Sequence, residues 1–95
     1  MVPAAIFLAS LTDYVNGIVH GRWAPARAPV AELQAVLAAV LASSPWAART
    51  GELAEEWIIL DHEGFIGRAP DAHEALADVA ALAGRPAGGP TGWRP

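Results

Sequence analysis

The stretch EEWIILDHEGF, residues 55–65, decides the fold of this 95-residue chain. Four consecutive apolar residues, Trp57 to Leu60, have the length and composition of a β-strand. A continuous apolar run of this kind predicts a strand that is covered on both faces or lies centrally in its sheet. Two glutamates precede the run and Asp61, His62 and Glu63 follow it, so the charges form either a reactive site or a surface for another molecule.

Two further strands are expected before this one. Residues 4–11, AAIFLASL, are apolar and of strand length, and residues 18–23, IVHGRW, alternate as a half-buried strand does. The stretch between them, residues 12–17, TDYVNG, is typical of a turn because Asn-Gly accepts positive φ. The pattern therefore predicts an antiparallel pair, followed by a loop over residues 24–29.

Two helices complete the predicted fold. Pro29 suits a first helical turn, and apolar residues at helical spacing continue to Ser43, after which residues 45–54 are expected to be a loop. Asp71 and Glu74 have the spacing of a capping box, and an apolar stripe follows them up to Gly84.

The predicted fold class is therefore α+β, with a small three-stranded mixed or antiparallel sheet and two helices in the order β-β-α-β-α. One domain is expected over residues 1–84, because a chain of this length has room for one core. Residues 85–95, rich in glycine and proline, are expected to form a flexible tail.

The composition indicates a globular cytoplasmic protein. The hydrophobic share is 54%, and the chain contains no cysteine for disulfides or thiolate metal sites. Its first residues have no basic leader, and the longest apolar helix is expected to be about 14 residues, too short to span a bilayer. We therefore expect no signal peptide and no membrane partner.

The negative charge is concentrated in one segment. The formal net charge of the chain is −4, and residues 52–78 contain a single arginine, Arg68. A protein that binds nucleic acid directly needs a coherent basic face, so none is expected as a partner. The same segment holds eight carboxylates: Glu52, Glu55, Glu56, Asp61, Glu63, Asp71, Glu74 and Asp78.

Asp61, His62 and Glu63 make a weak reactive site. Successive side chains of a strand point to opposite faces, so only the two carboxylates can share one. The other histidines, His20 and His73, lie on other predicted elements, whereas zinc needs three or four converging ligands. We expect no metal, no cofactor and no catalytic residue, and a small hydrolase using these three side chains is the third of three hypotheses.

The helix over residues 29–43 has an outer face of alanine and valine, which predicts a surface for self-association or for a protein partner. Val36, Ala39 and Trp46 are the residues expected to make that contact. Trp23 and Trp57 lie on predicted strands and are expected in the core.

Two separated motifs carry a resemblance to a known family. Residues 9–23, ASLTDYVNGIVHGRW, resemble the opening of ArdA-type antirestriction proteins, in which a strand ending in small-Ser-Leu precedes a Tyr- and Gly-containing turn and a strand ending in G-x-W. Residues 55–65 are similar to the family's second block, and Leu60 and His62 are the departures from it. The helix over residues 71–83 resembles the family's next helix, so the resemblance covers roughly residues 5–83. The matching positions are Ser10, Leu11, Tyr14, Gly17, Gly21, Trp23, Glu55, Glu56, Trp57, Ile59, Asp61, Glu63 and Phe65.

The resemblance implies inhibition rather than catalysis. ArdA-type proteins are encoded on mobile genetic elements and evade host defence by imitating DNA. They occupy the DNA groove in the methyltransferase core of type I restriction–modification enzymes, with carboxylates in place of phosphates. By this resemblance the eight carboxylates of residues 52–78 would bind the enzyme.

The family's chains are nearly twice as long and more acidic, so the resemblance implies a shortened form. One turn of DNA carries roughly 20 phosphates, more than eight carboxylates can reproduce. The protein would then assemble with copies of itself, cover a smaller footprint, or have left antirestriction. The alternative hypothesis is a non-catalytic interaction module that kept the ArdA N-terminal fold and binds through the helix over residues 29–43.

Overall fold

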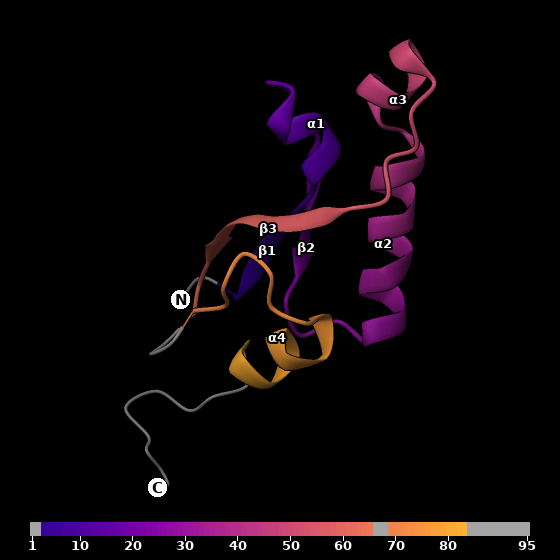
Figure 1. Cartoon of the computed structure of the whole chain (residues 1–95). Helices are drawn as coiled ribbons and strands as arrows, with labels where there is room; N and C mark the ends of the chain where they lie inside the picture. Colours follow the sequence, from indigo (N-terminus) through magenta and orange to yellow (C-terminus); the bar gives the residue numbers. More distant parts are fainter. Residues whose placement is uncertain (1–2, 66–68, 84–95) are drawn as a thin grey trace, which may run out of the picture.

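A computed structural model describes residues 3–65 and 69–83 of the chain. Its elements in chain order are β1 (Ala5–Ser10), α1 (Leu11–Val15), β2 (Gly21–Pro25), α2 (Val30–Ala42), α3 (Pro45–Thr50), β3 (Trp57–Glu63) and α4 (Leu76–Ala83). Figure 1 shows the sheet with α2 beside it and α4 below it. The α+β class and the order of the predicted strands and helices are confirmed. The predicted tail, residues 85–95, lies outside the described residues.

The sheet has the order β2-β1-β3, and both pairings are antiparallel. β1 is therefore the central strand. The prediction that residues 57–60 are central in the sheet, or covered on both faces, was wrong, because β3 is an edge strand and only Ile59 of its apolar run is fully buried. All four positions of the run can nevertheless be apolar, because Trp57, Ile58 and Leu60 are each half-buried.

The core lies on one face of the sheet. Ile6 and Leu8 of β1 point to this face and are fully buried, as the alternation of a strand requires. Leu33 and Leu37 of α2 and Val79 of α4 pack in the same cluster. Among the described residues, α2 and α4 pack on this face, and Trp23 on the opposite face, called the open face below, is 44% exposed.

Two short helices appear where the sequence predicted a turn over residues 12–17 and a loop over residues 45–54. α1 begins because the Ser10 side chain accepts a hydrogen bond from the Asp13 N–H, and α3 begins because the Ser44 side chain accepts one from the Ala47 N–H. Pro45 occupies the first turn of α3, and Gly51 ends it with a φ of 82°. Helix capping, rather than apolar periodicity, produces both elements.

Several boundaries also differ from the prediction. β2 begins at Gly21 instead of residue 18, and β3 continues to Glu63. The predicted capping box forms in part, because the Asp71 N–H donates to Glu74 Oε1 at 3.2 Å. It closes a turn that precedes α4, and the helix itself begins at Leu76.

Each outer edge of the sheet has one feature that limits pairing with another strand. On β3, the Ile59 N–H donates to the carbonyl of Ala72 at 2.8 Å, so the segment before α4 lies along that edge. On β2, bonds between Ser10 and His20 and between Ala26 and Ala4 set the alternation that turns the backbone of Pro25 outward. Because proline has no N–H, β2 offers a shortened donor row to another strand.

The segment Val30–Thr50, 21 residues long, has by length and composition the character of a membrane span, and it is the one such segment in the described ranges. It is divided at Ser43 and Ser44 into α2 and α3, so α2 alone has 13 residues. Leu33, Leu37 and Val40 of α2 are buried in the protein, whereas the apolar window of the segment is 22% buried as a whole.

The core predicts a contrast between two leucines. Replacing Leu33, which is fully buried, by alanine should lower the free energy of unfolding by about 2–5 kcal/mol, because a cavity remains. Leu53, 78% exposed, is the matched control, and its replacement should change the same quantity by less than about 0.5 kcal/mol. Urea denaturation followed by circular dichroism measures both, and equal losses would contradict the core described above.

Candidate functional site

Among the described residues, Asp13 is the one charged residue that is buried. Its side chain is fully buried, and its Oδ2 accepts a hydrogen bond from Ser44 Oγ at 2.6 Å while Oδ1 accepts one from the Trp46 N–H at 2.9 Å. The backbone carbonyl of Asp13 accepts from the N–H groups of Asn16 and Ile18. One residue therefore ties the β1–β2 connection to the start of α3.

The hydrogen bonds hold Asp13 in its charged form. Burial alone would raise the pKa of this carboxyl group, but side-chain hydrogen bonds with Ser10 and Ser44, the Trp46 N–H and the charge of His20 together lower it below the ordinary value of 3.8. Hydrogen-bond donors of the protein thus replace water around the Asp13 carboxylate.

These hydroxyl groups are committed to structure. Ser10 and Ser44 are 0% and 2% exposed, and each accepts a helix-capping N–H bond. A substrate cannot reach either oxygen, so the Asp13 cluster is a structural clamp.

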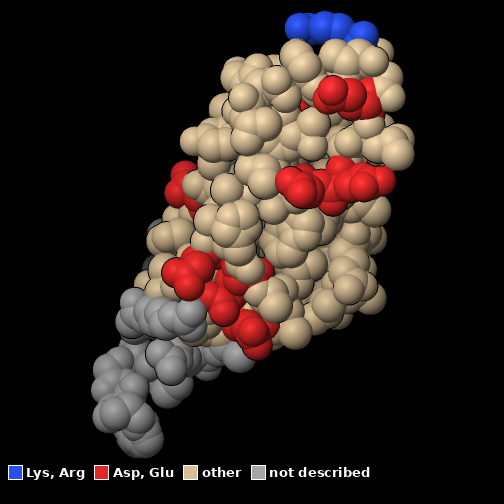
Figure 2. All heavy atoms as spheres, in the orientation of Figure 1, with Lys and Arg blue, Asp and Glu red and all other residues tan. Residues whose placement is uncertain are grey.

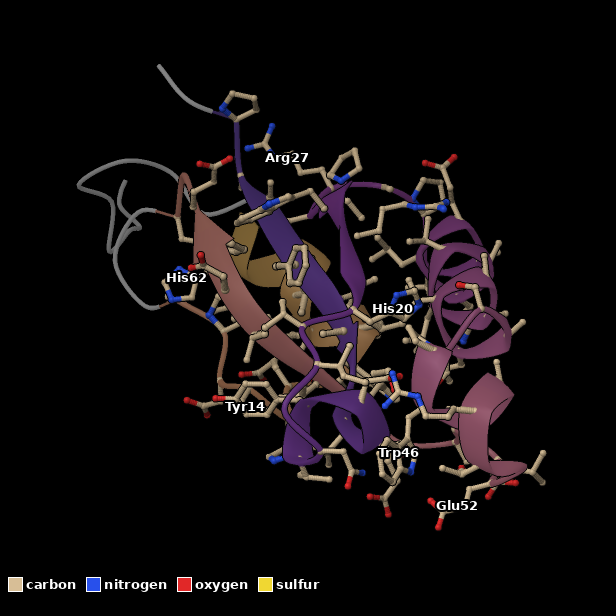
Figure 3. All side chains as sticks on the ribbon, turned by 90° about the horizontal axis from the view of Figure 1, so that it is seen from above. Tyr14, His20, Arg27, Trp46, Glu52 and His62 are labelled. Carbon is tan, nitrogen blue, oxygen red and sulfur yellow. The ribbon has the colours of Figure 1, made fainter. Side chains whose placement is uncertain are left out.

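A second connection links the β1–β2 loop to α2. His20 Nε2 lies 2.9 Å from the Val40 carbonyl oxygen and 3.1 Å from Ser43 Oγ, at the C-terminal end of α2. A histidine N–H donated to the Val40 carbonyl adds a second donor to one of the last carbonyls of α2, which also accepts from Ser43 Oγ at 3.2 Å. In Figure 3, His20 lies between the strands and α2, and Trp46 and Glu52 lie close together at the end of α3.

The sequence reading missed this clamp, because it assigned Asp13 to a turn. A usable signal is present in Ser10-Leu11-Thr12-Asp13, which has the Ser-x-x-acid spacing of a helix start. Ser44 followed by Pro45 is the corresponding signal for α3. Only the pairing of Asp13 with Ser44, across 31 positions, needed the structure.

Seven of the eight predicted carboxylates are exposed, and Glu74 is half-buried. Glu55 and Glu56 lie in the segment that enters β3, and Asp61 and Glu63 lie at its other end. Glu52 accepts a hydrogen bond from Trp46 Nε1 at 2.7 Å, which fixes its place beside α3. Figure 2, in the orientation that has β3 at the front, shows acidic groups from the α3 end down to α4, with basic atoms visible at the α3 end alone.

Asp61, His62 and Glu63 do not converge. In β3 they pair with Phe7, Ile6 and Ala5 of β1 in turn, so the histidine points away from the face shared by the two carboxylates. Within the described ranges, no group of three or more histidine, cysteine, aspartate or glutamate side chains is placed to hold a metal ion. The His62 ring instead packs edge-on against Phe65, with centroids 5.9 Å apart.

The residues predicted for self-association lie at different depths. Ala39 is exposed on α2, whereas Val36 is half-buried and packs against the core, and Trp46 is half-buried on α3. The exposed outer face of α2 consists largely of alanines, at positions 31, 35, 38, 39 and 42. A contact through this face stays a prediction.

Trp23 is a correction. It was expected in the core, but its side chain is 44% exposed on the open face of the sheet, while Trp57 is half-buried against the core cluster as expected of a strand residue. The reason is that both long helices cover the opposite face.

Comparison with known proteins gives one match. The family model described as "Antirestriction protein (ArdA)" matches residues 6–88, which is most of the chain. No curated protein and no solved structure matches.

The clamp predicts a pH-dependent stability difference. Asp13→Asn should lower the free energy of unfolding at pH 7 by about 2–3 kcal/mol. The amide oxygen can still accept one hydrogen bond, but the amide nitrogen cannot accept, so either the Ser44 hydroxyl or the Trp46 N–H loses its acceptor. The pKa of Asp13 is lower in the folded protein, so its contribution is complete above the ordinary value of 3.8 and is lost as the pH falls through the folded value. The difference between parent and variant, measured by urea denaturation, should therefore be present between about pH 5 and 7 and shrink below about pH 4.

Glu32→Gln, at an exposed position of α2, is the control and should change stability little at any of these pH values. An Asp13→Asn variant as stable as the parent at pH 7 would show that the carboxylate is not a clamp.

Proposed function

The chain belongs to the ArdA family of antirestriction proteins, and from this membership we propose that it inhibits type I restriction–modification enzymes by imitating DNA. The family is non-catalytic and acts on restriction–modification enzymes. The proposed partner surface on the enzyme is the DNA groove of its methyltransferase core. The protein would act in the cytoplasm, where such enzymes meet incoming DNA, on behalf of a mobile genetic element.

The observation that supports mimicry is the exposure of the carboxylates around β3. Asp61 and Glu63 are two positions apart in a strand, which separates them by about 7 Å along it. Glu55 and Glu56 extend the charge beyond the other end of the strand, and Asp71, Glu74 and Asp78 continue it toward α4. A basic groove that binds phosphates would be attracted by such a row.

The footprint follows from the number of charges. Each DNA strand carries one phosphate per about 3.4 Å of helix axis, so carboxylates about 7 Å apart supply roughly half that density. A single copy would therefore contact part of the groove. The protein would compete with DNA best at low ionic strength, where screening is weak.

A second candidate is the interaction module. It is favoured by the exposed alanines of α2, which leave one side of that helix without charge. In this case the protein, or a homo-oligomer of it, would bind through α2, and binding would be insensitive to salt.

One pair of variants separates the two candidates. The quadruple amide variant, Glu55→Gln, Glu56→Gln, Asp61→Asn and Glu63→Gln, removes four negative charges at exposed positions around β3. Its control places lysines at exposed alanines 31, 35, 38 and 42 of α2, which changes the net charge by the same amount on another surface. Efficiency of plating of unmodified phage on a type I restricting host that expresses each protein measures inhibition.

Under mimicry, the quadruple amide variant should bind the methyltransferase core about 30- to 1000-fold more weakly, if each charge contributes roughly 0.5–1 kcal/mol. Its binding should also lose most of its salt dependence, whereas the lysine control should bind as the parent does. The reverse result, with protection lost only in the lysine control, would replace mimicry with the interaction module. Light scattering of both variants reports whether self-association through α2 accompanies that result.

A further inference from the structure

Three side chains form a row across the open face of the sheet. Phe7 of β1 is directly opposite Trp23 of β2 on one side and directly opposite Asp61 of β3 on the other. The rings of Phe7 and Trp23 have centroids 5.5 Å apart and an interplanar angle of 62°, an edge-to-face contact. Two aromatic rings and a carboxylate are thus neighbours on one surface, and Figure 3 looks onto this face with α4 behind the sheet.

A hollow of about 260 Å³ lies at this row. Its lining consists of Phe7, Val19, Trp23, Leu60 and Asp61. Val19 is 68% exposed, so the hollow opens to solvent. Asp61 is the one charged residue of this lining, and its Oδ1 is oriented by a hydrogen bond from the His62 N–H at 2.8 Å.

Two irregularities of the sheet produce this arrangement. The register of β1 with β3 shifts between Phe7 and Leu8, so that Leu8 pairs with Ile59 and Phe7 with Asp61, and Leu60 is the extra residue. Uninterrupted pairing would have placed Leu60 opposite Phe7, so the bulge brings a carboxylate to the row instead.

The second irregularity is Gly21. A side chain at Gly21 would meet Phe7 Cε2 at 2.8 Å and the Leu8 carbonyl oxygen at 2.4 Å, so glycine leaves space for the Phe7 ring. The bulge and the glycine together determine which groups line the hollow.

We propose that this hollow binds one arginine side chain of a partner protein. A guanidinium group is planar, stacks on aromatic faces and can donate two parallel hydrogen bonds to a carboxylate. Trp23 and Phe7 supply the ring surfaces, and Asp61 supplies the opposite charge. This rests on the proposed function, because a groove that binds DNA phosphates carries arginines.

Other occupants fit the lining less well. An apolar side chain would desolvate the Asp61 carboxylate without giving it a partner, and an anion would be repelled by it. A lysine ammonium would satisfy the charge, but it is more strongly hydrated than a guanidinium and cannot stack. An arginine of a second copy, such as the exposed Arg22 or Arg49, is the remaining alternative.

The experiment uses a guanidinium probe and its uncharged counterpart. The peptide acetyl-Gly-Arg-Gly-amide is titrated into the full chain while the indole N–H resonance of Trp23, identified with Trp23→Leu, is followed by NMR. The same peptide with citrulline in place of arginine has nearly the same shape without the charge, and a lysine peptide tests the ammonium group.

The arginine peptide should shift the Trp23 resonance to saturation, and the citrulline peptide should not. Asp61→Asn, a surface change that leaves the rings in place, should weaken binding about 2- to 5-fold, as expected for the loss of one exposed ion pair. Tyr14→Leu and Glu32→Gln, an exposed aromatic residue and an exposed carboxylate outside the hollow, are the matched controls and should leave the affinity unchanged.

Equal responses to the arginine and citrulline peptides, or no response to either, would overturn the proposal. A Trp23 resonance that shifts when the protein alone is concentrated, and no longer does so after Arg22→Gln or Arg49→Gln, would assign the hollow to a second copy and overturn the choice of partner.

The plating assay separates this proposal from mimicry itself. Trp23→Leu removes one ring surface of the hollow, so it should reduce inhibition about 3- to 10-fold. It removes no charge, so the salt dependence of binding should be retained. Undiminished inhibition by Trp23→Leu, beside a quadruple amide variant that is inactive, would reject the arginine pocket and leave mimicry in place. Selective arginine binding by a chain that does not protect phage DNA would support the pocket and reject the proposed target.

Discussion

The buried carboxylate of Asp13 is the contact on which one end of this fold depends. α1 and α3 have five and six residues, far below the length at which a helix is stable alone in water. Each is started by a serine cap, and Asp13 joins the two caps by accepting from Ser44 and from the Trp46 N–H. Trp46 in turn orients Glu52. Through Trp46, the buried carboxylate of Asp13 therefore helps to position the exposed carboxylate of Glu52.

The protein thus uses its carboxylates in two different ways. Asp13 is surrounded by donors and serves the fold, whereas Glu55, Glu56, Asp61 and Glu63 are exposed at the surface. Exposed like charges contribute little to stability, and they repel one another mildly. Such a distribution separates the part of the sequence that folds from the part that is available to a partner, and membership of the ArdA family says what kind of partner that is.

Local patterns in the sequence were sufficient for the α+β class, for α2 and for the exposure of the acidic segment. The alternation in IVHGRW indicated a strand, although it ran three residues too early, and the apolar run Trp57 to Leu60 indicated another. What could not be predicted depends on contacts between distant residues. The edge position of β3 depends on the order of the strands, and the bulge at Leu60 depends on the register with β1. The exposure of Trp23 depends on which face α2 and α4 cover. The two short helices could have been found from their serine caps, because capping is a local signal.

The features at the edges of the sheet affect how high the concentration of this protein can rise before it aggregates. Under the proposed function the protein occupies its target, so it must be present in at least equal numbers, and soon after the foreign DNA enters. Crowded, newly made sheet proteins are prone to join edge to edge into fibrils. Here the backbone of β3 donates to Ala72, and β2 ends in Pro25. The chain can therefore accumulate quickly with less risk of coaggregation, and copies that do meet would associate through side-chain surfaces rather than by extending the sheet.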